Sequence, residues 1–363
     1  MRRFFFAIFV LLSLVVLLEN CRRESVASGS LYRGTKYTMQ IPFSFPEISS
    51  PYKDSLTYEG IALGRRLFYD KHLSLDGQKA CASCHHLQYA FSDSGNALSV
   101  NENGPIKRNA PSLQNLAWSP YFFWDGRAPT LAAQAQNAFQ HELDMNVTNA
   151  IVYLKTDTTD VMLFNKAFGG PGSITPNNIY LAIQQFLFSA VSANSRFDSV
   201  MRGQANFTIW EDSGFNYLFL TEKGDCFHCH AQGQSLLMYD AANPFRNDGL
   251  DSAATIYDFP DPGRGGITGV ASDYGLFKVP TLRNIAVSGP YMHDGRYQTL
   301  MQVINFYSDS LKQSPTIDPV MKTIYHANGG SHFTALQKME LLALLNTFTD
   351  TSFLNNPNLK SPF

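Results

Sequence analysis

The sequence predicts a mainly α-helical protein built of two domains with long connecting loops. Three observations support this prediction. The chain has 363 residues, which is enough for about two domains. Its periodic segments place apolar residues at helical spacing, and no β-rich segment stands out. Hydrophobic residues make up 44% of the chain and charged residues 16%, so a substantial core can form and global disorder is excluded.

Three segments carry the helical pattern most clearly. The first is predicted over residues 177–195, with Thr175 as its N-cap and Pro176 at its first position. The other two lie around residues 300–307 and 341–348. The apolar residues that define the three helices are Ile179, Ile183, Phe186, Leu187 and Ala190; Leu300, Val303, Ile304 and Tyr307; and Leu341, Leu344, Leu345 and Phe348. Gly-, Pro- and Asp-rich stretches such as 240–273 are predicted to be long loops.

The N-terminus has the pattern of an export signal. Arg2 and Arg3 precede an apolar run over residues 4–18, so we expect residues 1–20 to be a signal peptide and the protein to be exported to the periplasm. Cys21 follows at the spacing of a lipoprotein signal, which predicts that a lipid on Cys21 holds the chain to a membrane. A simple secreted protein and a retained N-terminal anchor remain alternatives. Residues 21–52 are predicted to form a tether and an extended arm.

The net charge of −2 argues against a protein that neutralises nucleic-acid phosphates, so no nucleic-acid partner is expected.

Four of the five cysteines form two C-x-x-C pairs, and a histidine follows each pair directly. The residues are Cys81, Cys84 and His85 in the first motif, and Cys226, Cys229 and His230 in the second. C-x-x-C-H is the attachment motif of c-type haem: two thiols add to the haem vinyl groups and the adjacent imidazole binds the iron. A zinc ribbon would need the pairs much closer together, and structural disulfides would leave both histidines unexplained.

The two motifs therefore predict two covalently bound c-type haems, one in each domain. We expect a first haem domain over residues 53–205 and a second over residues 206–363, with the boundary near residues 203–206.

Several longer strings around these motifs resemble one family, the bacterial dihaem cytochrome c peroxidases. In the first half the strings are residues 63–70, 81–85, 108–113 and 123–127, and in the second half residues 277–284 and 290–296. The resemblance covers residues 53–353. It implies that the protein reduces hydrogen peroxide to water with electrons from a small cytochrome, a cupredoxin or another redox protein. The family also contains the MauG-like enzymes, which oxidise a protein substrate. A dihaem electron carrier without peroxidase activity is the alternative.

The resemblance further implies that peroxide reacts at the haem of His85. No histidine occurs from Leu87 to Phe123, so we expect an open distal face that needs no reductive activation. Above that face the family places a glutamine and a carboxylate that moves a proton between the peroxide oxygens. Gln134 matches the glutamine. Asp144 matches the carboxylate position, where the family has glutamate, and Glu142 is the alternative.

The resemblance also assigns the residues that connect and complete the two haem sites. Trp124 matches the tryptophan that lies between the haems. Tyr307 falls on the position of the second haem's sixth ligand, which is methionine in the peroxidases proper and tyrosine in MauG-like members. Met292 and Met301 are nearby sulfur alternatives.

Two further features come from the resemblance alone. It implies a calcium ion between the domains, with Asn109, Ser288 and Pro290 at the ligand positions. His293 matches a residue near the haem propionates. A homodimer is a further expectation for the assembly of the chain.

Overall fold

A computed structural model of the chain describes residues 34–48, 50, 51, 53–93, 100, 101, 104, 105, 108–143, 146–230, 244–323, 326 and 328–363. The predicted signal peptide, Cys21 and Asp144 lie outside the described residues. Lipid attachment at Cys21 therefore stays a prediction, and so does the homodimer, because the structure holds one chain. None of the helices in the described part combines the length and apolar character needed to span a bilayer.

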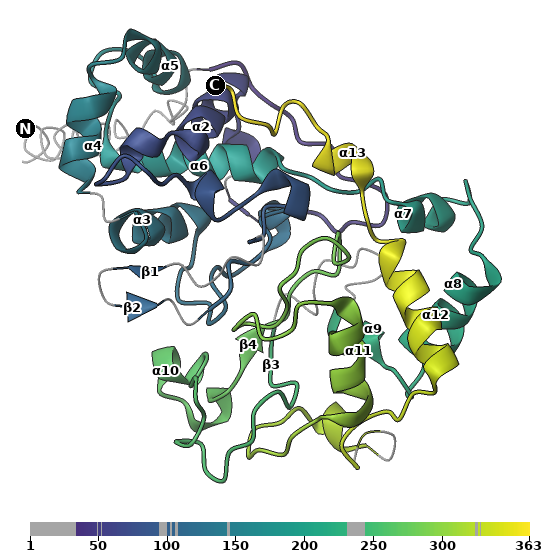
Figure 1. The fold of residues 1–363 in the computed structure, drawn as a ribbon. Helices are drawn as coiled ribbons and strands as arrows, with labels where there is room; N and C mark the ends of the chain where they lie inside the picture. The colour runs from purple at the N-terminus through teal and green to yellow at the C-terminus, as the bar shows by residue number, and fades with distance from the viewer. Residues whose placement is uncertain are drawn as a thin grey trace, which may run out of the picture.

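The mainly α-helical fold is confirmed, and the described strands are two antiparallel pairs of two residues each. Helices of the first half lie on one side of the molecule in Figure 1 and helices of the second half on the other. In chain order the helices of the first half are α2 (Tyr58–Tyr69), α3 (Leu131–His141), α4 (Val147–Leu154), α5 (Thr158–Phe168) and α6 (Pro176–Ser189). Those that follow are α7 (Arg196–Met201), α8 (Ile209–Ser213), α9 (Cys226–His230), α10 (Gly265–Thr268), α11 (Leu300–Asp309), α12 (Ala335–Asn346) and α13 (Thr351–Leu354). The strands are β1 (Val100–Asn101), β2 (Gly104–Pro105), β3 (Phe245–Arg246) and β4 (Phe277–Lys278).

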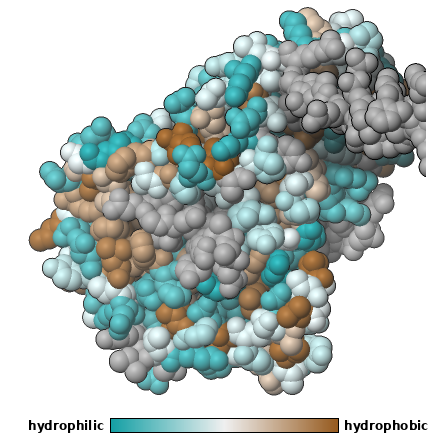
Figure 2. Space-filling model, turned by 180° about the vertical axis from the view of Figure 1, so that it is seen from behind, coloured by the Kyte–Doolittle hydropathy of each residue, from teal (hydrophilic) through white to brown (hydrophobic). Residues whose placement is uncertain are grey.

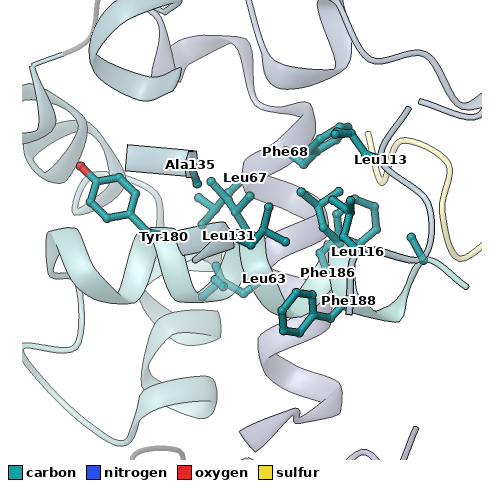
Figure 3. Packing of buried hydrophobic residues seen from close by; sticks show 14 of the residues in the cluster. Leu63, Leu67, Phe68, Leu113, Leu116, Leu131, Ala135, Tyr180, Phe186 and Phe188 are labelled. Atoms are coloured by element: carbon teal, nitrogen blue, oxygen red, sulfur yellow. The ribbon is translucent and has the colours of Figure 1, made fainter. Parts of the chain in front are cut away.

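The core of the first half forms where α2 crosses α6. Leu63 and Leu67 of α2 are buried against Phe186 of α6, and α3 covers them with Leu131 (Figure 3). Gly64 permits this close crossing, because a Cβ at that position would collide with the carbonyl of Ala182. The α2–α6 pair therefore forms the packed core against which the first C-x-x-C-H motif lies, through contacts with α2.

The long predicted helix begins as expected and ends earlier. The Thr175 side chain accepts a hydrogen bond from the Asn178 N–H, and Pro176 is the first helical residue. The helix stops at Ser189 rather than at residue 195. Beyond it, the backbone N–H groups of Ala193 and Asn194 donate to a carboxylate oxygen of Asp350 at 3.0 and 2.9 Å. These tertiary hydrogen bonds replace the ones that a longer helix would have made, which local periodicity does not reveal.

The predicted helices around residues 300–307 and 341–348 are confirmed as α11 and α12. Thr299 and Thr334 cap them, each accepting from the third residue of its helix. Leu341 and Leu344 of α12 are buried against the π-helical segment Gly214–Phe219, which leads toward the second C-x-x-C-H motif. The end of the chain then returns to the first half, where Phe353 and Leu359 join its core and the Tyr69 hydroxyl donates to the Leu359 carbonyl (Figure 1).

The two halves contain an internal repeat with a constant spacing of 169 positions. Asn109 pairs with Lys278 in this repeat, and Trp124 pairs with His293. The identical residues are Pro111, Leu113, Asn115, Ala117, Ser119, Asp125, Gly126, Arg127, Thr130 and Leu131, which recur as Pro280, Leu282, Asn284, Ala286, Ser288, Asp294, Gly295, Arg296, Thr299 and Leu300.

The backbone follows this repeat. Asn115 and Asn284 both have a left-handed conformation, with φ of 57° and 56°. The two D-G-R turns are each closed by an isolated antiparallel bridge, Phe122 to Ala128 and Tyr291 to Tyr297.

Reciprocal hydrogen bonds join the two repeats. The Asn109 N–H donates to the His293 carbonyl and the Lys278 N–H donates to the Trp124 carbonyl, each at 2.7 Å. A buried network supports this contact: the Asn284 side-chain amide donates to Gln114 and to Ser192. The relative position of the two halves is thus set by buried polar groups that satisfy one another.

A buried ion pair stabilises the repeat of the second half. The Arg283 guanidinium, which is 1% exposed, donates to both carboxylate oxygens of Asp198 at 2.9 and 2.8 Å and lies over the Phe45 ring. Burial opposes ionisation of Asp198, but the hydrogen bonds from Arg283 outweigh it and lower the pKa of the carboxyl. The pair therefore stabilises the fold above the unfolded carboxyl pKa of about 3.9, and this contribution is lost as the pH falls below that value.

We expect Asp198→Ala to lower the free energy of unfolding by about 3–5 kcal/mol, because the substitution leaves the Arg283 charge buried without its carboxylate. Urea unfolding of the holoprotein at pH 7, followed by circular dichroism, measures the change. Asp54→Ala is the control: its carboxylate lies 3.4 Å from Lys36 and is exposed, so its removal should cost less than about 1 kcal/mol. Equal effects of the two substitutions would contradict this account of the ion pair.

Candidate functional sites

The first C-x-x-C-H motif forms one wall of a cavity in the first half. Cys81–Ser83 make a single 3-10 turn, and the His85 N–H donates to the Cys81 carbonyl at 3.0 Å, which presents the imidazole to the cavity. Cys84 and His85 line the cavity from this side. The facing walls come from the 108–127 segment and from α3.

The second motif occupies α9, a short helix beside a second cavity. Cys226, Cys229 and His230 all line this cavity. Apolar side chains of α11 and α12, among them Ile304 and Leu341, form the opposite walls. Each half thus holds its motif against a mostly apolar hollow, which suits a large flat cofactor with an apolar face.

Both motif histidines are prepared to bind a metal through Nε2. The His85 Nδ1 lies 2.6 Å from the Phe91 carbonyl, and the His230 Nδ1 lies 3.0 Å from the Pro280 carbonyl. A carbonyl can only accept, so Nδ1 carries the proton in each ring and the Nε2 lone pair is free. Burial lowers the pKa of His85 and lowers that of His230 to about 4, so both rings are neutral at physiological pH.

All four motif cysteines are available for thioether bonds. None is in a disulfide, and burial raises the pKa of Cys84 to about 11 and that of Cys81, Cys226 and Cys229 to about 12. Within the described residues, no group of three or more His, Cys, Asp or Glu side chains is arranged to hold a metal ion. Paired thiols with one neutral imidazole beside an apolar cavity fit covalent haem at each motif and do not fit a zinc site.

Two side chains predicted to act in peroxide chemistry line the first cavity. Gln134 projects from α3, and Glu142 follows the last turn of that helix. Burial raises the pKa of the Glu142 carboxyl, with Arg127 opposing this shift. The Arg127 guanidinium lies 3.4 Å over the Phe123 ring and lines the same cavity. Asp144, which the resemblance favours, lies outside the described residues, so its role stays a prediction.

Trp124 lies between the two cavities and lines both of them. Its indole N–H donates to the Asn109 carbonyl at 2.8 Å, and its own carbonyl accepts the Lys278 N–H. These hydrogen bonds, one to a residue of each repeat, fix the ring at the junction of the two halves.

Tyr307 of α11 lines the second cavity, as does His230. Its hydroxyl donates to Asp248 at 3.2 Å, and burial raises its pKa well above the ordinary value. Met292 and Met321 also line this cavity, and the sequence did not point to Met321. Met301, the other sulfur alternative, is not among the residues around it.

The predicted calcium ligands do come together at the junction. The Asn109 side-chain N–H donates to the Pro290 carbonyl at 2.5 Å, and the Ser288 carbonyl accepts from the Ser92 hydroxyl at 3.1 Å. The Asn109 Oδ1 is buried and has no hydrogen-bond partner among the described residues. A buried carbonyl oxygen without a donor is a suitable ligand for a hard cation.

His293, predicted to lie near the propionates, is buried and lines the second cavity. Its ring stacks on Phe277 with 3.7 Å between the centroids, and its Nε2 is 4.0 Å from an Asp261 carboxylate oxygen. Burial lowers its pKa, so the ring is neutral at physiological pH.

The sequence analysis did not single out Lys278, Arg127 or Asp248. The internal repeat was the signal available for Lys278, because it pairs that residue with Asn109. No comparable pattern marks Asp248, which reaches Tyr307 across 59 positions of the chain.

Comparisons with known proteins agree with this geometry. A family model for di-haem cytochrome c peroxidases matches residues 58–206. Methylamine utilization protein MauG of Methylophilus methylotrophus is 30% identical over 333 residues, which are 88% of this chain and 92% of that protein. Cytochrome c551 peroxidase of Nitrosomonas europaea is 32% identical over 251 residues, which are 67% of this chain and 70% of that protein.

The fold also matches a solved structure. The crystal structure of a MauG-like protein associated with microbial copper homeostasis superposes with a TM-score of 0.78 at 32% identity, covering 90% of this chain and 99% of that one.

Proposed function

The chain belongs to the di-haem cytochrome c peroxidase family, as a MauG-like member carrying two c-type haems, and from this premise we propose a role for each of its site residues. The protein is an oxidoreductase that uses hydrogen peroxide and exchanges electrons with a protein donor or substrate. The observation that carries the proposal is the place of Trp124, which lines both cavities at once.

We propose that peroxide is reduced in the first cavity. Haem bound through Cys81, Cys84 and His85 would supply the iron that takes up oxidising equivalents from peroxide. Reduction of one peroxide to two waters consumes two electrons and two protons. Gln134 is positioned to hold the bound oxidant by hydrogen bonding, and Glu142 to move a proton between its two oxygens. Burial raises the pKa of the Glu142 carboxyl, which is the direction of shift that a carboxyl acting as both proton donor and proton acceptor requires.

We propose that the electrons come through the second cavity. Haem bound through Cys226, Cys229 and His230 would be completed by Tyr307 from the opposite wall. Trp124 then provides the aromatic ring between the two sites. An oxygen ligand favours the oxidised iron, so this arrangement favours sharing of the two oxidising equivalents between the sites and their withdrawal from a protein substrate, the MauG-like version of the reaction.

The decisive experiment mixes the fully ferric holoprotein with one equivalent of hydrogen peroxide in a stopped-flow spectrometer. We expect a rapid change in the haem absorption bands without pre-reduction, because no histidine is available from Leu87 to Phe123 to close the first site. A reaction that requires pre-reduction would overturn the MauG-like version and leave a gated peroxidase. No reaction in either state would leave the electron carrier.

The same measurement separates the two candidate proton carriers. We expect Glu142→Gln to slow the reaction with peroxide by about 100-fold or more, since loss of a general acid–base group typically costs that much. Asp144→Asn is the matched control, two positions along the same segment, and should react at the wild-type rate. The opposite result would transfer the role to Asp144 without affecting the assignment of the enzyme class.

Ligation by Tyr307 has its own test. We expect Tyr307→Met to raise the reduction potential of the second haem, because methionine favours the reduced iron more than an oxygen donor does. Spectroelectrochemical titration measures the potential. Tyr297→Phe is the control, because Tyr297 packs against Phe306 and is not among the residues around the cavity. Unchanged potentials in both Tyr307→Met and Tyr307→Phe would favour a sulfur ligand such as Met292.

We further propose that Asn109 Oδ1 and the carbonyls of Ser288 and Pro290 hold a calcium ion between the halves. Metal analysis of the holoprotein should then find one calcium per chain, removable by a chelator. Asn109→Ala should weaken calcium binding at least about tenfold, and the exposed Asn358→Ala should not change it. Calcium-free holoprotein with full activity would refute this site.

A further inference from the structure

The internal repeat places Lys278 where the first half has Asn109, and the two side chains bind equivalent partners. The Asn109 amide donates to the Pro290 carbonyl at 2.5 Å, while the Lys278 ammonium donates to the Tyr121 carbonyl at 3.1 Å. Pro290 and Tyr121 are themselves separated by the 169 positions of the repeat. Two related sites therefore exist at the junction, and one of them contains a cationic side chain.

Lys278 lies between the two cavities. Its side chain lines both of them and is partly exposed. Its backbone N–H holds the Trp124 carbonyl at 2.7 Å. The ammonium is also 6.0 Å from the centre of the Phe122 ring, beside the same loop. No other described cationic side chain lines both cavities, since Arg108 and Arg127 line the first and Arg246 the second.

We infer that Lys278 is a positioning residue that raises the reduction potentials of both haem sites. Its ammonium lies at the position that corresponds to the Asn109 site and places a positive charge beside Trp124. The inference rests on the proposed function for the identity of the two cavities. It does not depend on whether calcium occupies the Asn109 site.

The physical argument is electrostatic. A positive charge in a low-dielectric interior stabilises an added electron on either side of it and destabilises a hole on the indole. Burial lowers the pKa of Lys278 to about 8, with Asp125 opposing the shift. The charge is therefore largely present at pH 7 and is lost as the pH rises through about 8.

The other charged groups around Lys278 are paired or titrate elsewhere. On the side of the first cavity, Asp125 is bound by Arg108 and Arg127, and Asp261 is bound by Arg108. Glu142 and Asp93 are the other carboxyls that line this cavity. On the side of the second cavity, Asp318 is 3.2 Å from Arg246, Asp248 accepts from Tyr307, and burial lowers the pKa of His293. Asp225 and His326 also line this cavity, and burial raises the pKa of Asp225 and lowers that of His326.

The test measures the reduction potentials of both haems in the holoprotein, by spectroelectrochemistry without peroxide, for wild type, Lys278→Met and Lys278→Arg. We expect Lys278→Met to lower both potentials at pH 7 and Lys278→Arg to retain them. Between pH 7 and 9 the wild-type potentials should fall with an inflection near 8. Both variants should lack that inflection, because methionine never carries the charge and arginine never loses it.

Two outcomes would overturn the inference: wild-type potentials in Lys278→Met, or an inflection that persists in both variants. Full haem content in Lys278→Arg shows that the position tolerates substitution, so a low potential confined to Lys278→Met reports charge rather than misfolding. Because no peroxide is used, failure of the proposed function and failure of this inference are distinguishable: the former appears in the stopped-flow reaction, the latter in the potentials.

Discussion

The arrangement of this molecule depends on the two reciprocal hydrogen bonds at its centre, from Asn109 N–H to the His293 carbonyl and from Lys278 N–H to the Trp124 carbonyl. Each bond joins a backbone N–H of one repeat to a backbone carbonyl of the other. Both accepting residues, His293 and Trp124, line the second cavity. A shift of one half against the other would break both, and would also expose the buried amide network of Asn284. Buried polar groups without partners are costly, so the contact has one favourable geometry. Trp124 belongs to both cavities for this reason.

The same junction explains how a symmetric scaffold supports two different sites. Corresponding positions of the repeat hold Trp124 and His293, Asn109 and Lys278, and Gln134 and Val303. The first half thus places a hydrogen-bonding amide on α3 where the second half has an apolar side chain on α11. Four positions further along α11, Tyr307 enters the second cavity instead. The backbone is shared, and a few substitutions at fixed positions give the two cavities different side chains.

Much of this could be predicted from the sequence, because the chemistry is encoded in local strings. The C-x-x-C-H motifs require their spacing, and the capped helix α6 begins where Thr175 and Pro176 predict. The end of α6 could not be predicted, since Asp350 withdraws the backbone from the helix across more than 150 positions of the chain. The neutral state of His230 could not be predicted from the sequence either, because it follows from burial and from the Pro280 carbonyl.

Glu142 and Asp144 are the two candidate proton carriers, and the place of Glu142 in the fold is the reason to favour it in the proposal. The resemblance counts positions from Gln134 and arrives at Asp144, whereas the fold puts the carboxyl of Glu142 in the wall of the cavity, directly after the C-terminal turn of α3. A proton carrier must reach the reacting oxygens and must have a pKa that lets it exchange protons near neutrality. Glu142 lines the cavity from the end of α3, where burial raises its pKa and Arg127 opposes the shift. One extra methylene relative to aspartate also extends its reach. We therefore propose that the partner of Gln134 comes from the C-cap of the same helix, α3.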